Sequence, residues 1–232
     1  MNFVQQAGTL AAASSVTLTL PAPATVGNLL VVWVSHFSST TPTLGGNISV
    51  SSWTLLGTTS LGVGSLTLWQ YAGIVTVAGT TVSSTEASSA YSYIAAAEFN
   101  GAPASVVADG TATTGSSLTG GTHPTTAPYT SSNASDLIVA CSNMQGASDN
   151  TPPAGWSALP VVNTQLSPIY QIVTATGSFT PVWGSIANTG WVAVCAGIRV
   201  PPPVTFKPGY PVSALIEEAT EGMQQSNVVP WP

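Results

Sequence analysis

The chain has 232 residues, of which two are basic and eight acidic, and its formal net charge is −6. At roughly 25% charged residues, an ordinary soluble chain of this length would carry about 58, so uncharged side chains must cover most of the surface. Phosphate contacts need clusters of Lys and Arg that this chain lacks, which argues against nucleic acid and anionic membranes as partners. We expect such a surface to be buried against copies of the chain or another partner; a monomer with a neutral, Thr-rich coat is the alternative.

The first half of the chain reads as a series of strands. Residues 2–6 and 14–20 open it, because apolar residues at 16, 18 and 20 alternate with threonines, as in a strand that is wet on one face. Residues 27–35 (GNLLVVWVS) form a continuous apolar run that predicts a buried strand. We expect an exposed loop at 38–46 and further strands at 53–58, 65–76 and 91–99.

The second half repeats this order. The segment SDLIVACSN from Ser135 corresponds to GNLLVVWVS from Gly27, Trp156 corresponds to Trp53, and Tyr170 corresponds to Tyr71. Further strands are expected at 156–162, 167–174, 179–183 and 191–200, and residues 111–132 are expected to be mostly loop.

The many short strands with turn residues between them predict an all-β fold. We expect one antiparallel, jelly-roll-like β-sandwich over residues 1–200, built from two pseudo-repeats at about 15–102 and 103–200 that each supply part of both sheets. Two tandem immunoglobulin-like domains are the alternative.

Residues 201–232 form a different kind of segment, because three successive prolines at 201–203 impose an extended course. Within this C-terminal arm, residues 213–221 are the candidate helix, and they are too few to hold a helix without docking. The side chains expected to dock are Leu215, Ile216 and Met223, with Trp231 as a further anchor. Our hypothesis is that the arm docks on a neighbouring subunit; the alternative is that it folds back on its own domain.

The inventory of reactive groups is small. Cys141 and Cys195 lie in apolar strands and are expected to be free buried thiols, with a disulfide between neighbouring strands as the alternative. His36 and His123 are expected to make surface or interface hydrogen bonds. No catalytic, cofactor-binding or metal-binding residues are therefore predicted.

The carboxylates bear on one enzymatic alternative. Glycosidases need two carboxyl groups roughly 5 to 10 Å apart on one groove. The candidates are scattered through the chain and predict no such pair: Glu86, Glu98, Asp109, Asp136 and Asp149. Calcium held by Asp109 or Asp149 with loop carbonyls stays open, although no ligand spacing supports it.

Seven tryptophans raise the question of sugar stacking. Trp53, Trp156 and Trp191 occupy repeated positions in apolar settings and are expected in the core. Trp69 and Trp183 are instead expected at contacts within an oligomer, with stacking on a glycan as the alternative.

The apolar segments also resemble a known class of proteins. GNLLVVWVS, SSWTLLG, LWQYAGIVTVAG and YSYIAAAEFNGA, followed by SDLIVACSN, PPAGWSAL, YQIVTATGSFTPVW and GWVAVCAGIRV, are similar to β-sandwich virion proteins of tailed bacteriophages, of the minor tail and capsid-decoration type. The similarity covers about residues 15–200, and no catalytic residues come with it.

This resemblance implies a non-enzymatic structural protein of the virion. Capsid decoration is the expected role, and a tail or tail-fibre component is the first alternative. Its partners would be copies of itself, for which a trimer is one option, and other virion proteins such as the major capsid or tail proteins. A carbohydrate-binding module or adhesin is the second alternative.

The expected location is the virion, after synthesis in the host cytoplasm. Residues 1–15 lack the basic start and long apolar core of a secretion signal. No unbroken apolar run, including that of residues 29–34, is long enough to span a membrane.

Overall fold

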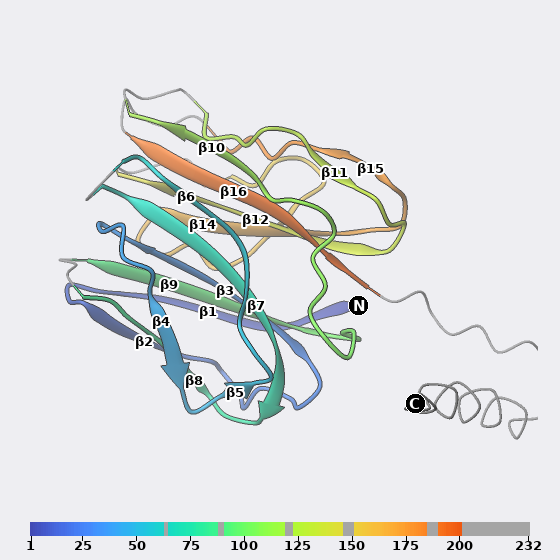
Figure 1. Ribbon diagram of the computed structural model, residues 1–232, viewed down its shortest axis with the longest axis horizontal. Helices are drawn as coiled ribbons and strands as arrows, with labels where there is room; N and C mark the ends of the chain where they lie inside the picture. Colours follow the sequence, from blue (N-terminus) through green and yellow to red (C-terminus); the bar gives the residue numbers. More distant parts are fainter. Residues whose placement is uncertain (63–64, 88–90, 119–122, 146–150, 185–189, 201–232) are drawn as a thin grey trace, which may run out of the picture. The chain divides into compact units, whose positions relative to one another are not determined.

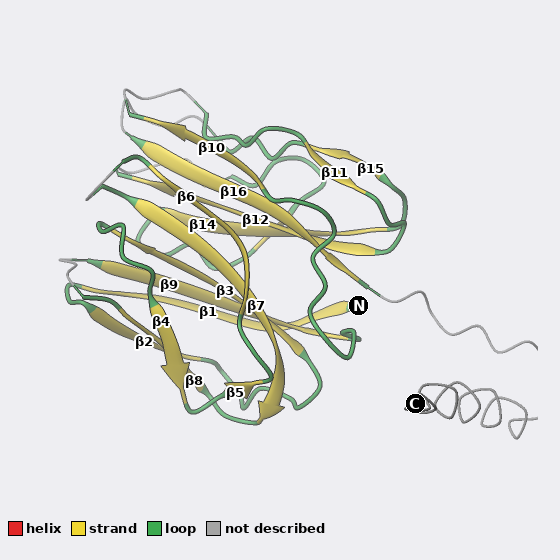
Figure 2. Ribbon diagram, viewed as in Figure 1, coloured by secondary structure: helices red, strands yellow, loops and turns green. Residues whose placement is uncertain are grey.

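The computed structural model describes residues 1–62, 65–87, 91–118, 123–145, 151–184 and 190–200. All the regular structure in these ranges is β-strand, paired in antiparallel sheets (Figures 1 and 2). The prediction of an all-β antiparallel fold is confirmed. Met1–Pro201 forms one compact unit. The expected arm with Leu215, Ile216, Met223 and Trp231 lies outside the described residues.

The first main sheet is built entirely from the first half of the chain. Its order is β1-β9-β3-β7-β5, and β6 also pairs with β7. The strands are β1 (Asn2–Ala11), β3 (Leu29–His36), β5 (Ser49–Val50), β6 (Thr54–Ser60), β7 (Thr67–Val77) and β9 (Ser92–Asn100).

The second main sheet is built entirely from the second half, in the order β10-β16-β12-β14-β13. Its strands are β10 (Thr113–Ser117), β12 (Asp136–Met144), β13 (Ser157–Ala158), β14 (Leu166–Val173) and β16 (Trp191–Arg199). Two small sheets complete the fold: β2 (Ser15–Thr19), β8 (Thr81–Thr85) and β4 (Thr43–Gly46) form one, and β11 (Tyr129–Ser131) and β15 (Gly177–Phe179) form the other.

Three apolar cores join these sheets into four layers. The central core lies between the two main sheets, where Val31 and Trp33 of β3 and Val139 of β12 belong to one cluster. A second core joins the outer face of the first main sheet to β2-β8-β4, and a third joins the outer face of the second main sheet to β11-β15. Both main sheets are therefore covered on both faces, which explains why β3 and β12 read as continuous apolar runs.

The expected division of the sheets between the two halves is wrong. Each half supplies one main sheet and one small sheet, not part of both main sheets. Alternation along a strand shows which residues share a face, but it does not show which sheet the strand joins. The order β1-β9-β3-β7 in the first main sheet corresponds strand by strand to the order β10-β16-β12-β14 in the second. Jelly-roll topology and duplication of the chain stay predictions.

The cysteines are free and buried, as predicted. Cys141 faces the central core and Cys195 faces the third core, so the two thiols lie on opposite faces of one sheet. Their strands are neighbours, but Cys141 pairs with Val194 and not with Cys195. This geometry excludes the alternative of a disulfide between them. Burial raises the pKa of both thiols.

A polar bridge crosses the otherwise apolar central core. The Trp33 indole Nε1 donates to Gln70 Oε1 over 2.7 Å, and Gln70 Nε2 donates to the Val139 carbonyl over 3.4 Å. Trp33 and Gln70 are both fully buried. The bridge thus links the first main sheet to the second at a point where water cannot replace either partner.

We predict that the Trp33–Gln70 hydrogen bond stabilises the fold. Gln70→Met keeps most of the side-chain volume but leaves the indole N–H unpaired, which should lower the free energy of unfolding by about 1–3 kcal/mol. Trp33→Phe removes the donor. Denaturant unfolding of both single variants and of the double variant should show that the two losses are less than additive. Strict additivity would contradict the bridge.

Candidate functional site

Ionisable side chains are the first candidates for a site, and in the described residues they lie inside the fold. Glu98, Asp109 and Asp136 are fully buried, and Glu86 is 7% exposed. Arg199 is the exception, since about half of its side chain is exposed. The remaining fixed charges in the sequence, Asp149, Lys207, Glu217, Glu218 and Glu221, lie outside the described residues. The described surface therefore displays no carboxylate.

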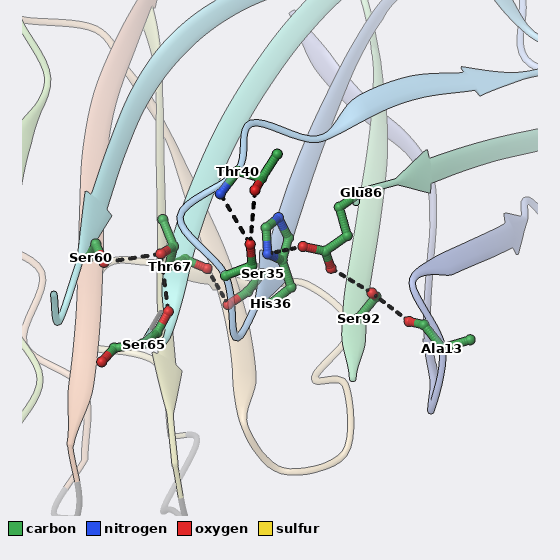
Figure 3. Close-up of polar contacts among 10 residues, drawn as sticks. Ala13, Ser35, His36, Thr40, Ser60, Ser65, Thr67, Glu86 and Ser92 are labelled. Atoms are coloured by element: carbon green, nitrogen blue, oxygen red, sulfur yellow. Dashed lines mark hydrogen bonds and ion pairs between the residues drawn. The ribbon is translucent and has the colours of Figure 1, made fainter. Parts of the chain in front are cut away.

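The first buried polar cluster surrounds His36, the last residue of β3 (Figure 3). His36 Nδ1 lies in close contact with Glu86 Oε2, and Glu86 Oε1 accepts a hydrogen bond of 2.9 Å from Ser92 Oγ. The imidazole also stacks on the Trp69 ring, with the ring centroids 4.2 Å apart. His36 is fully buried, so the expected surface role of this residue is wrong. Burial lowers the pKa of His36 to about 4, so the imidazole is neutral at pH 7.

The second cluster surrounds Glu98 of β9. Glu98 Oε1 accepts hydrogen bonds from the Thr25 amide at 2.8 Å and from Asn28 Nδ2 at 2.6 Å, and Glu98 Oε2 accepts one from Gln5 Nε2. Gln5 also bonds the backbone of Ala22 in both directions. The carboxylate thus ties three separate segments of the first half together.

The third cluster brings two carboxyl groups together. Asp136 begins β12, and Asp109 is anchored to β16 by the bond from its amide to the Gly197 carbonyl. Asp109 Oδ1 accepts from Arg199 Nε at 3.1 Å, and Asp109 Oδ2 accepts from the Ser132 amide at 2.6 Å. Asp136 Oδ2 accepts from Ser131 Oγ at 2.7 Å. The expectation that all the carboxylates are scattered is wrong for this pair.

Below about pH 6 the pair divides into an ionised acid, Asp109, and a protonated acid, Asp136. Burial by itself would raise the pKa of Asp109, but hydrogen bonds from Ser132, Asp136 and Arg199 outweigh burial and lower that pKa. Burial, followed by the neighbouring Asp109 carboxylate, raises the pKa of Asp136 to about 6. Asp136 Oδ1 is buried and has no hydrogen-bond partner in the described structure, and a hydrogen bond between the Asp136 and Asp109 carboxyl groups requires a proton on one of them.

This carboxyl pair is not arranged as a glycosidase site. Both side chains are fully buried, whereas a glycosidase holds its two carboxyl groups on either side of an accessible bond. The Arg199 guanidinium supplies the positive charge that a calcium ion at Asp109 would supply. Among the described residues, no three His, Cys, Asp or Glu side chains gather as metal ligands.

The tryptophans expected at oligomer contacts, Trp69 and Trp183, are buried inside the folded chain. Trp69 is 3% exposed and Trp183 is 1% exposed, and the Trp183 Nε1 donates to the Ser167 carbonyl over 3.1 Å. Trp191 is buried in the third core, as expected. His123 is exposed and its Nδ1 bonds the Trp183 carbonyl at 3.1 Å, so the prediction of a surface hydrogen bond is confirmed for this residue.

A shallow hollow lies beside the end of β14. It has a volume of about 260 Å³ and is lined by residues 171–176 and Phe179. The lining offers an aromatic ring, an amide and hydroxyl groups, and it contains no His, Asp or Glu. Such a lining can hydrogen-bond and stack but cannot transfer protons as a general acid or base.

No described helix is long and apolar enough to cross a membrane. Comparison of the chain with protein-family models, curated proteins and solved structures finds no match. The described carboxylates lie in buried clusters, and Arg199 is the one exposed charged side chain on the described surface.

We predict that the Asp109–Asp136 pair makes stability fall as pH rises from about 4 to about 6. In this window the folded chain keeps a proton on Asp136 that the unfolded chain has released. Asp136→Asn supplies an N–H donor without a proton to lose, as Asn28 does for Glu98. The variant should therefore gain stability relative to the wild type across this window, by on the order of 2–3 kcal/mol.

Denaturant unfolding at several pH values checks this expectation. His36 titrates with the opposite slope, because its lowered pKa makes stability fall as pH falls from 6.5 to about 4. It is present in both proteins, so its contribution cancels in the comparison. Asp109→Asn is the control and should destabilise the fold throughout this range, because it weakens the contacts to Arg199 and Ser132. A pH-independent difference between wild type and Asp136→Asn would contradict the shared proton.

Proposed function

We propose that the chain is a non-enzymatic structural protein that works in an assembly with copies of itself. The observation that carries this proposal is the described surface, where Arg199 is the one exposed charged side chain. Large apolar side chains share this surface: Phe3, Val4, Val26, Leu55, Val77, Tyr91, Val107, Leu118, Val161, Ile172 and Val182. A neutral surface generates little electrostatic repulsion between copies of the chain, and its apolar side chains favour contacts from which water is excluded.

The assembly that we propose is the virion of a tailed bacteriophage. The segments that resemble virion β-sandwich proteins include the central strands β3 and β12, around which the two main sheets are built. Capsid decoration suits a neutral surface, because repeated lateral contacts need no charged partner; a tail or tail-fibre position is the alternative. Residues 201–232 would dock on a neighbouring subunit, with Leu215, Ile216, Met223 and Trp231 as the anchoring side chains.

A carbohydrate-binding role is the second candidate, and one observation favours it. The hollow lined by residues 171–176 and Phe179 offers an aromatic ring beside amide and hydroxyl groups, which is the chemistry that recognises a sugar. Its volume of about 260 Å³ is below the usual range of small-molecule sites, roughly 300–1,000 Å³. We therefore place this candidate second.

Mass spectrometry of purified particles tests the virion proposal directly. The chain should be present at many copies per particle, and truncation after Val200 should lower its incorporation. The carbohydrate-binding role would replace the proposal if two results are found together. The chain would be missing from washed particles, and it would bind a glycan array in a way that the Phe179→Ala variant does not.

We predict that self-association is insensitive to salt. Contacts between neutral surfaces are not screened, so the association constant should stay level or rise between about 0.05 M and about 1 M NaCl. Sedimentation equilibrium of the full chain at both salt concentrations measures this. Association that weakens tenfold or more at high salt would mean that charged groups carry the contact, which contradicts the proposal.

A further inference from the structure

The outer edge of β1 is an open strand edge in the described structure. β1 pairs with β9 on one side, from Asn2 opposite Asn100 to Ala11 opposite Ser92, and it ends the order of the first main sheet. Alternate residues of such a strand turn their N–H and C=O groups away from the paired neighbour. No described backbone group bonds that outer side. A row of backbone donors and acceptors is therefore open to another strand.

β1 lacks the usual devices that protect a strand edge. Residues 2–11 contain no charged residue and no proline. One bulge, between Phe3 and Gln5, interrupts the pairing with β9. Residues 5–11 are regular, so seven successive residues can pair without a break.

The other edges of the main sheets are covered or interrupted. The outer side of β10 is covered by residues 125–127, since the Ala127 amide donates to the Thr114 carbonyl. β13 is only two residues long and lies between Pro153 and Pro160. β5, at the other end of the first main sheet, is only two residues long, and β6 has a bulge between Leu55 and Gly57. Among the described edges of the two main sheets, β1 is thus the long and unprotected one.

Side-chain contacts hold β1 in place on both of its faces. On the face toward the second main sheet, the Phe3 ring stacks on Tyr170 with centroids 5.8 Å apart and meets the Phe99 ring edge-on at 6.0 Å. On the other face, Gln5 bonds Ala22 and Glu98. The edge is therefore preorganised, and pairing with it would not require β1 itself to become ordered first.

We infer that two copies of the chain join through this edge, by antiparallel pairing of their β1 strands about a two-fold axis. Identical strands related by such an axis run antiparallel, and the resulting contact closes as a dimer. No ionic repulsion opposes it, because β1 carries no charge. The inference rests on the proposed function, because that function supplies a second copy of the chain as the partner of β1.

The sequence of the C-terminal arm makes that segment a poor occupant of the edge. Residues 201–211 contain five prolines, which cannot donate to a ladder of backbone hydrogen bonds. Residues 212–229 are free of proline, but the helix candidate at 213–221 occupies half of them. A second β1 offers a proline-free strand of the same length and regularity.

The test compares two threonine-to-lysine variants of the full chain. Thr9→Lys places a charge in the regular part of β1, and Thr130→Lys places the same charge in the middle of β11, on the other side of the fold. Sedimentation equilibrium should show dimers or higher even-numbered assemblies for the wild type and for Thr130→Lys. Thr9→Lys should weaken the association at least tenfold. Equal association constants for all three proteins would overturn the inference.

Hydrogen exchange on the wild type gives a measurement that needs no variant. Alternate amides of residues 5–11 should become protected as the protein concentration rises through the association range. Protection of these amides that is already complete in the monomer would mean that the same chain covers the edge, and it would overturn the inference. Exchange that stays fast in the associated state would overturn it as well.

The inference and the proposed function can fail separately. If the chain is incorporated into particles but Thr9→Lys associates like the wild type, the β1 contact is wrong and the virion role stands. If Thr9→Lys abolishes dimers while the chain is missing from particles, the β1 contact stands and the virion role is wrong.

Discussion

Burial of both main sheets on both faces is the constraint on which the rest of this structure depends. β3 and β12 lie at the centre of their sheets, and each contributes alternate side chains to two different cores. A polar side chain on these strands or their neighbours is costly to bury unless it finds a partner inside the protein, because water cannot supply one. The Trp33–Gln70 bridge and the three carboxylate clusters each meet this requirement. Ser142 and Asn143, near the end of β12, are buried without a side-chain partner in the described structure. Solvent contact is left mainly to loops, to the exposed faces of the small sheets and to strand edges.

The same requirement is met differently in the two halves of the chain. Asn28, just before β3, holds the Glu98 carboxylate through an amide N–H that is present at any pH. Asp136, the first residue of β12, holds the Asp109 carboxylate only while it keeps a proton. Arg199 partly offsets the charge of the second cluster. The donor in the first cluster therefore has no proton to lose, whereas the donor in the second cluster does, although both lie where a central strand begins.

Much of the fold follows from alternation in the sequence, and less of the site does. Residues 29–34 predict a central strand because apolar residues continue on both faces, and the structure confirms it. His36 shares a face with Val32 and Val34, so alternation already indicates that it is buried. The Asp109–Asp136 contact has no such signal, because it depends on how residues 110–135 return to the sheet. The hydrophobic alternation also does not predict which strands pair or which sheets pack together, since it shows the two faces of a strand but not its neighbours.

A chain with so few charges must protect its strand edges by other means. Proteins commonly place Lys on an exposed edge, but here the described residues contain no Lys at all, and backbone coverage, prolines and bulges do this work at β10, β13 and β6. Each of these features protects only the edge at which it occurs, because it depends on a particular loop, proline or bulge beside that strand. β1 has ten residues, side-chain contacts on both faces and one bulge near its start, so it differs from the other described edges of the main sheets. A regular and neutral edge of this kind is suited to pairing with a strand from another molecule, and a second copy of β1 matches it in length and in its lack of proline and charge.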